Sequence, residues 1–380
     1  MIYLDNASTT YPKPGRVAAA MQAYLTQSGV SPGRGGYAAA VSAERMLADV
    51  RRRLTQLVRG DEPTRMIFAA NGTDALNLAI HGVLRAGDHV VTTALEHNSV
   101  SRPLETLRRR GMITLTRVGF GADGVIDPGE IARAITPQTR LVALNHASNV
   151  TGAIQPAREV GAITARHDVL FLLDAAQTIG VIDIDISAWR VDLLAFPAHK
   201  ELLGPPGVGA LFVGPEVDIV PVRQGGTGGD SADPLQPPDW PSRLESGTPN
   251  TVGIAGLAAA LHGLEPLKTL ATVRACMAHF LDGVAEVPGI HRVGTAPVDR
   301  CVGTASVIID GIGVEEAGAI LDESFDIAVR AGLHCAPYAH RQYGTFPDGT
   351  IRVSPGPFTT PREIDAAVAA FRAIAEEVRN

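Results

Sequence analysis

The chain contains few cysteines and no long apolar run, and both shortages exclude classes of protein. Only Cys276, Cys301 and Cys335 occur among 380 residues, at no metal-ligand spacing, so neither a disulfide framework nor a metal site is expected. The longest apolar stretches, such as 169–173, are too short to cross a bilayer. The first residues lack the basic and apolar regions of a signal peptide. These absences predict a soluble cytoplasmic protein without a membrane segment.

Charged residues are also few, and acidic side chains only slightly outnumber basic ones. The chain has 33 basic and 40 acidic side chains and a net charge of −7, spread along its length. This balance argues against a protein that binds the phosphate backbone of nucleic acid. Apolar residues make up 45% of the chain, so a sizeable core can form, and the length suggests two domains or one large domain with a satellite.

The first two thirds of the chain alternate between short apolar runs and helix-like stretches. The runs are apolar on both faces, as in parallel strands covered by helices, and span 66–70, 89–93, 140–144, 169–173 and 192–196. Amphipathic stretches such as 74–84 and 157–167 lie between them, which predicts a doubly wound α/β domain. The run 207–213 follows after a short loop and is predicted to be antiparallel. A long Gly/Pro-rich loop is expected over 224–241.

The pattern changes after residue 255. Helices are predicted over 254–263 and 267–287, and strands over 305–309, 327–330 and 351–354. Thr360-Pro361-Arg362-Glu363 has the form of a capping box that starts a last helix. We therefore predict a large domain over 15–255 and a small α+β domain made of 1–14 and 256–380.

Three polar motifs follow predicted strands of the large domain. Asn71-Gly72-Thr73-Asp74 begins a helix, and a helix N-terminus suits a phosphate, although an ordinary capped turn has the same pattern. Asp174 and Lys200 follow the strands at 169–173 and 192–196. A helix-capping aspartate and a solvated lysine are the alternatives for each taken alone. Together, a phosphate cradle, an acid and an imine-forming amine are what pyridoxal phosphate requires.

Further ordered motifs carry a family resemblance from Tyr3 to Arg352. They are Glu96-His97-Asn98, His146-Ala147-Ser148-Asn149-Val150-Thr151-Gly152, Asp174-Ala175-Ala176-Gln177, His199-Lys200, Gly247-Thr248-Pro249-Asn250 and Arg330-Ala331-Gly332-Leu333-His334-Cys335-Ala336. With them the sequence resembles the class V aminotransferase-like pyridoxal-phosphate enzymes, and within these the cysteine desulfurases and selenocysteine lyases. The resemblance implies the fold-type-I architecture of a large, mainly parallel sheet domain and a smaller α+β domain.

The resemblance also implies roles toward the cofactor. Lys200 would hold pyridoxal phosphate as a Schiff base and move the Cα proton, and Asp174 would pair with the pyridine nitrogen. Gln177 would contact the phenolic oxygen, while His97 would stack on the ring and act in proton transfer. The phosphate would be held by Gly72, Thr73 and His199, and by Thr248 of a second subunit, which implies a homodimer.

Substrate positions follow from the same resemblance. Asn149 and Arg352 match the family's carboxylate-binding positions, a role that suits an arginine. Arg330 is a further candidate, with a structural ion pair as its alternative, and Arg34 lies in a Gly-rich stretch that would line the entrance.

Cys335 decides which reaction is expected. Its thiolate would take the substrate sulfur as a persulfide and leave alanine, as in the second of the two desulfurase groups. A free cysteine is ordinarily a small apolar filler, which is our interpretation of Cys276 and Cys301. Two departures from the family bear on cofactor affinity and on substrate fit, in that order, and neither removes the core machinery. Pro197-Ala198 replaces a hydroxyl residue and a glycine before the lysine, and Gly33 replaces a histidine.

Three hypotheses follow. The first is a cysteine desulfurase acting on L-cysteine, with selenocysteine lyase activity as a close variant and a sulfur-acceptor protein or small thiol as partner. The second keeps the cofactor but changes the reaction to that of an aminotransferase, an epimerase or another C–S lyase, and Pro197 and Gly33 motivate it. The third is a cofactor-binding scaffold without turnover, against which the intact Lys200 argues.

Overall fold

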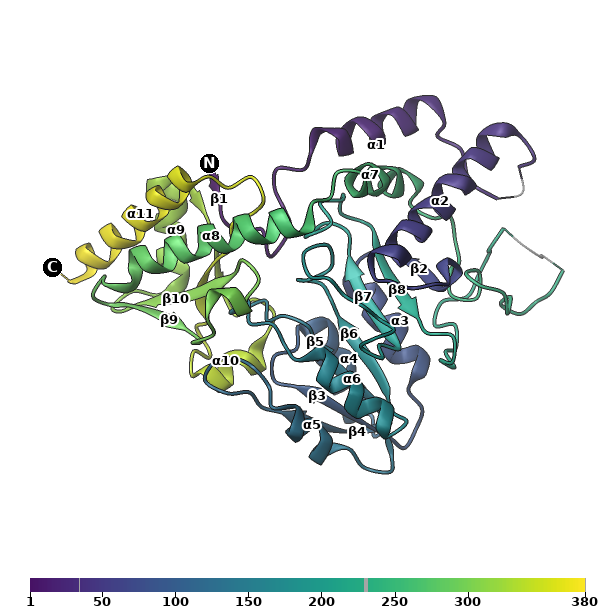
Figure 1. Cartoon of the computed structure of the whole chain (residues 1–380), viewed down its shortest axis with the longest axis horizontal. Helices are drawn as coiled ribbons and strands as arrows, with labels where there is room; N and C mark the ends of the chain where they lie inside the picture. The colour runs from purple at the N-terminus through teal and green to yellow at the C-terminus, as the bar shows by residue number, and fades with distance from the viewer. Residues whose placement is uncertain (34, 229–231, 380) are drawn as a thin grey trace.

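A computed structural model describes residues 1–33, 35–228 and 232–379. A larger lobe surrounds a central sheet, and a smaller lobe holds both chain termini (Figure 1). The helices are α1 (Gly15–Gln27), α2 (Ala38–Leu57), α3 (Gly72–Val83), α4 (Asn98–Arg109), α5 (Pro128–Ala134), α6 (Ala157–Arg166), α7 (Thr251–Leu261), α8 (Pro266–Ala285), α9 (Val314–Phe325), α10 (Pro337–Tyr343) and α11 (Pro361–Arg379).

The larger lobe is built on a mainly parallel sheet. Its strands are β2 (Met66–Ala69), β3 (Asp88–Thr93), β4 (Ile113–Val118), β5 (Thr139–Asn145), β6 (Leu170–Asp174), β7 (Leu193–Pro197) and β8 (Gly209–Val213). Within the described residues their order is β2-β8-β7-β6-β5-β3-β4. The strand β8 runs antiparallel to both of its neighbours, as the sequence predicts. The other pairs are parallel, so the doubly wound α/β prediction is confirmed.

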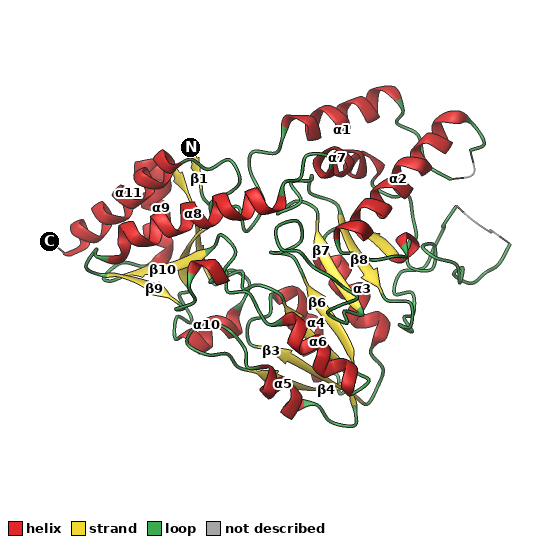
Figure 2. Ribbon diagram, viewed as in Figure 1, coloured by secondary structure: helices red, strands yellow, loops and turns green. Residues whose placement is uncertain are grey.

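Helices cover both faces of this sheet (Figure 2). One apolar cluster joins the strands to α3 and α4, and another joins them to α2, α5, α6 and α7. Because both faces are covered, the residues of β5 to β8 are nearly all buried. The carboxyl ends of the parallel strands lie at one edge of the sheet, where α/β proteins bind ligands.

The smaller lobe has its own sheet and core. Its strands β9 (Ile290–Val293), β10 (Ala305–Ile309), β12 (Arg330–Gly332) and β13 (Thr350–Val353) pair antiparallel in the order β12-β13-β10-β9. Helices α8, α9 and α11 pack on it through a cluster that includes Leu4, Phe280 and Phe371. The core of the small lobe includes Leu4 from the N-terminal segment, whereas α7 runs through the proposed boundary at 255/256 and packs on the large lobe through Leu257. The boundaries at 14/15 and 255/256 remain a proposal.

Several local predictions are tested by the strands and caps. The capping box is confirmed, since the Thr360 amide donates to Glu363 Oε2 at 2.7 Å and Glu363 N donates back to Thr360 Oγ1. The predicted strand 327–330 is wrong as one element. It divides into β11 (Ile327–Ala328), which pairs with β1 (Ile2–Tyr3), and β12, which joins the small sheet. The division occurs because the chain passes from one sheet to the other at Val329.

The N-terminal segment (residues 4–13) connects the two lobes. It leaves the small lobe beside Ser354, whose backbone bridges to Asp5. It then reaches the large lobe, where the Thr10 hydroxyl donates to the carbonyl of Lys200 at 2.8 Å. Residues from both ends of the sequence therefore meet at the edge of the large sheet. Among the described residues, no helix combines the length and hydrophobicity needed to span a membrane.

Candidate active site

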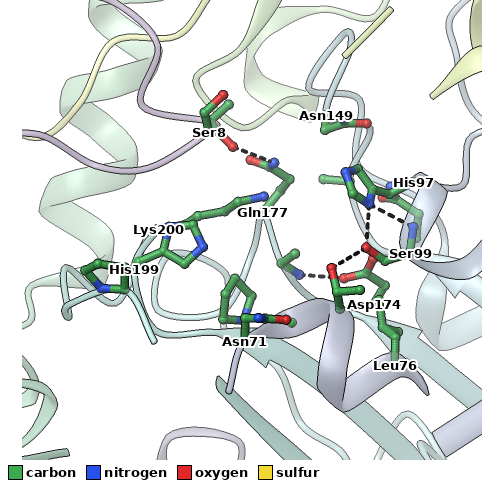
Figure 3. A pocket seen from close by; sticks show the side chains of 18 of the residues that line it. Ser8, Asn71, Leu76, His97, Ser99, Asn149, Asp174, Gln177, His199 and Lys200 are labelled. Carbon is green, nitrogen blue, oxygen red and sulfur yellow. Dashed lines mark hydrogen bonds between the residues drawn. The ribbon is translucent and has the colours of Figure 1, made fainter. Parts of the chain in front are cut away.

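A cavity of about 420 Å³ lies at the carboxyl ends of β5, β6 and β7, where the N-terminal segment and the small sheet close over them (Figure 3). We call it the inner cavity. It brings together most of the predicted site residues: Gly72, Thr73, His97, Asn149, Asp174, Gln177, His199, Lys200, Arg330 and Arg352. Cys335 and Thr248 line other cavities. Arg34 lies outside the described residues.

One end of the inner cavity is the N-terminus of α3. Asn71 caps this helix by accepting a hydrogen bond from Asp74 N at 2.9 Å. No hydrogen bond within the described part of the chain engages the amide groups of Gly72 and Thr73, which both line the cavity. Free amides at a helix N-terminus bind anions well. A Cβ at position 72 would lie 3.1 Å from Pro197 Cδ, so the glycine is needed where the proline packs against the cradle.

The inner cavity also contains an acid and an amine. Asp174 ends β6, is 5% exposed and accepts a hydrogen bond from Ala176 N at 3.0 Å. Burial raises the pKa of Asp174, while the Ala176 amide and the Lys200 ammonium act in the other direction. Burial lowers the pKa of Lys200 to about 8, against the opposing attraction of Asp174. At pH 7 about a tenth of Lys200 is therefore the nucleophilic free amine, far more than for a lysine with an ordinary pKa.

His97 faces Lys200 across the cavity (Figure 3). The Ser99 amide donates to His97 Nδ1 at 3.0 Å, so Nδ1 carries no proton and the neutral ring is protonated at Nε2. Burial, followed by the nearby Lys200, lowers the pKa of His97 to about 3. His97 is thus a neutral ring that can donate a hydrogen bond from Nε2.

Ser99 is a site residue that the sequence did not single out. Its hydroxyl lies 2.8 Å from His97 Nδ1 and 2.7 Å from Thr73 Oγ1. Because Nδ1 only accepts, Ser99 donates to His97, and Thr73 donates to Ser99. The Thr73 hydroxyl hydrogen is therefore directed at Ser99, and the anion cradle depends chiefly on the amide groups of α3. The available signal was the position of Ser99 in the first turn of α4, two residues after the N-cap residue His97.

His199 and Gln177 complete this side of the cavity. Burial, followed by Lys200 and Lys13, lowers the pKa of His199 to about 4, so this ring is neutral and would serve an anion as a hydrogen-bond donor. Gln177 Nε2 donates to Ala7 O at 3.0 Å. The carbonyl of His199 accepts from Thr9 Oγ1 and from Lys13 Nζ. The N-terminal segment thereby fixes the backbone just before Lys200.

The small lobe forms another wall of the inner cavity through Arg330 and Arg352. Arg352 is 1% exposed and donates to Asp5 Oδ1 at 2.5 Å, to Ser8 Oγ at 2.7 Å and to Asn149 O at 3.0 Å. Its Nε has no partner among the described residues. Asn149 Nδ2 donates to His334 O at 2.5 Å, so this amide holds the segment before Cys335 as well as lining the cavity.

Cys335 lies at a boundary between two cavities. Its Sγ accepts from Arg330 Nη2 at 3.3 Å, and Arg330 Nη1 donates to Ser8 Oγ at 2.9 Å. Arg330 lines the inner cavity, while Cys335 and Arg330 both line an outer cavity of about 1120 Å³ between α4, β12 and α10. Cys276 and Cys301 are buried in apolar clusters. Cys335 therefore differs from both in its exposure and in its arginine partner.

The comparisons with known proteins agree with this geometry. The family model described as aminotransferase class-V matches residues 2–367. The chain belongs to the class-V aminotransferase family. It is 34% identical to a "Probable cysteine desulfurase" of Methanothermobacter thermautotrophicus (96% of this chain, 92% of the relative). It is 31% identical to "Probable cysteine desulfurase 2" of Mycobacterium leprae (97% and 90%).

Solved structures give the same assignment. The apo cysteine desulfurase of Thermococcus onnurineus matches with a TM-score of 0.91 at 27% identity, covering 100% of this chain and 94% of that one. The Escherichia coli cysteine desulfurase CsdA matches with a TM-score of 0.88 at 25% identity, covering 99% and 94%. These relatives place the class-V chain in the cysteine desulfurase group, as the motifs indicate.

Class-V aminotransferases and cysteine desulfurases depend on pyridoxal phosphate, and the inner cavity of this class-V chain has the donors to hold it. The free amides of α3 match a phosphate, the buried Asp174 matches a protonated ring nitrogen, and Lys200 supplies the amine. The hydroxyl residue that the family has at the position of Pro197 is absent. The neighbouring amide groups of α3 would therefore bind the phosphate without it. The residues present therefore fit the cofactor.

We predict that Lys200 of the cofactor-free enzyme reacts with an amine reagent along a pH curve centred near 8, because only the neutral amine is nucleophilic and burial lowers this pKa. Asp174→Asn removes an attraction that raises the pKa, so the midpoint is expected to move to lower pH. Competitive acetylation followed by peptide mass spectrometry measures both curves. The exposed Asp183→Asn serves as control, and a midpoint for Asp174→Asn at or above the wild-type value would contradict the assigned pairing.

Proposed function

We propose that this class-V enzyme is a pyridoxal-phosphate-dependent cysteine desulfurase that converts L-cysteine to L-alanine and leaves the sulfur on Cys335. One observation carries the proposal. Arg330 donates from Nη1 to Ser8, which lines the inner cavity, and from Nη2 to the thiol of Cys335. A nucleophilic sulfur therefore lies beside the cavity that contains Lys200.

Four residues of the chain have separate roles in the proposed reaction. When bound, pyridoxal phosphate supplies the electron sink that lets a proton leave Cα. Lys200 Nζ takes and returns that proton, since its lowered pKa leaves part of it neutral. Arg352 holds the substrate carboxylate through charge-assisted hydrogen bonds. Asp174 holds the cofactor ring nitrogen, and His97 lies over the cavity as a neutral donor.

Cys335 performs the sulfur transfer. A bond between its Sγ and the substrate sulfur replaces the C–S bond of L-cysteine, and the substrate Cβ gains a proton. The thiol becomes a persulfide and the released product is alanine, so atoms and electrons balance without an external oxidant. A thiol acceptor then removes the outer sulfur and restores Cys335.

The product assay tests this function. Cofactor-loaded enzyme with L-cysteine and dithiothreitol is expected to release sulfide and alanine in equal amounts. A keto acid without sulfide would instead indicate an aminotransferase, and an enzyme that forms neither product would contradict the assignment.

We infer that the sulfur acceptor approaches Cys335 from the outer cavity. Cys335 lines the outer cavity and not the inner one, and arginines of α4 and α10 (Arg102, Arg109 and Arg341) surround that opening together with the acids Glu105, Glu315 and Asp348. A protein thiol can therefore reach the persulfide while the inner cavity is occupied. The exposed Thr106, on the α4 wall of this opening, is the place to test it. Thr106→Trp is expected to slow transfer to a thiol-bearing peptide more than to dithiothreitol.

We further infer a homodimer. Thr248 does not line the cavity that contains Lys200, although Gly207 lines both that cavity and the one at Thr248. Thr248 would therefore contact the cofactor that is bound in a second copy of the chain. Sedimentation of the loaded enzyme tests this, and a purely monomeric active enzyme would contradict it.

A further inference from the structure

Two arginines lie directly opposite one another in the small sheet. The antiparallel register of β12 and β13 pairs Arg330 with Arg352. Like charges at directly opposed positions repel each other and destabilise a sheet. A partner that accepts from both guanidinium groups is therefore needed to hold them in place.

The hydroxyl of Ser8 is that partner. Ser8 Oγ accepts from Arg330 Nη1 at 2.9 Å and from Arg352 Nη2 at 2.7 Å, and it donates to Asp5 Oδ1 at 2.8 Å. One donor and two acceptor positions are all that a hydroxyl offers, so the hydrogen-bonding capacity of Ser8 is fully used. Tyr3 Oη fixes this turn by donating to Asp5 O and Thr9 O.

The charges around Ser8 do not balance. Among the described residues, Asp5 is the one carboxylate in hydrogen-bond contact with the arginine pair. Two guanidinium groups thus share one negative charge, and Lys200 nearby adds a partly protonated amine. The buried Nε of Arg352 also has no partner among these residues. An additional anion is therefore favoured at this point, and a carboxylate matches the planar donors of arginine.

We propose that Ser8 is a positioning residue that holds Arg330 and Arg352 together as one carboxylate site beside the thiol of Cys335. The identity of the carboxylate as that of an amino-acid substrate rests on the proposed function. Arg330 Nη2 donates to Cys335 Sγ. The arginine that binds the carboxylate therefore also sets the distance between the carboxylate and the sulfur of Cys335.

Alkylation of Cys335 tests this without any turnover. Iodoacetate carries a carboxylate and iodoacetamide does not, so the ratio of their rates at Cys335, divided by the ratio for a free thiol, measures carboxylate capture beside the sulfur. In cofactor-loaded enzyme this ratio is expected to fall about tenfold in Ser8→Ala, the lower end of the effect of losing one hydrogen bond to a charged group. Ser8→Thr, which keeps the hydroxyl, is expected to restore most of it.

The ratio cancels changes in the intrinsic reactivity of the thiol. Peptide mass spectrometry assigns the modification to Cys335, since Cys276 and Cys301 are buried. The exposed Ser31→Ala is the matched control. An unchanged ratio in Ser8→Ala, including an equal loss of both rates, overturns the proposal. If the enzyme is a desulfurase, the KM for L-cysteine rises in Ser8→Ala with kcat nearly constant, whereas failure of the desulfurase assignment leaves the alkylation result intact.

Discussion

Lys200→Met is expected to abolish turnover of L-cysteine, with a loss of about 10⁴-fold or more, because we propose this lysine as both the cofactor-binding amine and the proton carrier. Methionine has a similar length and no amine. The sequence contains three lysines, Lys13, Lys200 and Lys268, and Lys13 is engaged with the carbonyl of His199. The loss is measured as sulfide and alanine formed by protein reconstituted with pyridoxal phosphate.

The same variant is expected to be more stable than the wild-type enzyme when both are free of cofactor. Burial lowers the pKa of Lys200 from 10.5 to about 8, so below pH 8 the folded state holds a charge that it disfavours. The unfolded chain binds the proton more tightly, so this destabilisation diminishes as the pH rises from about 8 to 10.5. Denaturant unfolding at pH 7 and pH 10 is expected to show a stability difference that is larger at pH 7.

The exposed Lys268→Met provides the matched control, because Lys268 lies on α8 and pairs with Glu265 at the surface. It is expected to retain activity. Comparable sulfide release by Lys200→Met and Lys268→Met would remove Lys200 from the mechanism and with it the proposed function.

Cys335→Ala is expected to reduce sulfide release from L-cysteine by about 10²-fold or more, because it removes the nucleophile that we propose receives the sulfur. Cofactor binding is expected to persist, since Cys335 does not line the inner cavity. A rapid-quench experiment without reductant measures the prediction, with one alanine per active site in the first turnover of the wild type and none in the variant.

The choice of alanine matters for the backbone. His334 and Cys335 have φ values of 48° and 59°, a left-handed conformation that costs a non-glycine residue about 1 kcal/mol or more. Alanine has the same Cβ and keeps this cost unchanged, so the variant removes the sulfur alone. Cys276→Ala, in the core of the small lobe, is the control for loss of a buried thiol. Full cysteine activity in Cys335→Ala would exclude the persulfide route.

The elements that were predictable are those whose residues are buried on both faces. The five apolar runs of the large domain are strands β2, β3, β5, β6 and β7. The strands β4 and β9 escaped prediction because each lies at a sheet edge with some of its residues exposed, whereas β2, also at an edge, is buried throughout. A partly exposed edge strand mixes exposed and buried residues, so that β4 reads ITLTRV without a continuous apolar run.

The site was predictable where one motif supplies one function. Lys200, Asp174 and Gly72 each follow a strand, and the structure gathers them at one cavity. Ser8 has no local signal in the sequence. Its role depends on the register that brings Arg330 opposite Arg352, and both arginines lie more than 320 positions after Ser8 in the chain. The motif around Cys335 likewise identified the residue, but the left-handed backbone that directs it to the outer cavity was not visible in the sequence.

The long sequence separation between Asp5 and Arg352 has a consequence for biosynthesis. During translation the large sheet is complete once residue 213 has been made, and domains generally fold in the order of synthesis. Arg352 and the strand that carries it emerge much later, and Asp5 and Ser8 have no guanidinium partner until then. A nascent chain therefore exposes Lys200 and Asp174 until Arg352 and the rest of the small lobe have been made and close the cavity that they share.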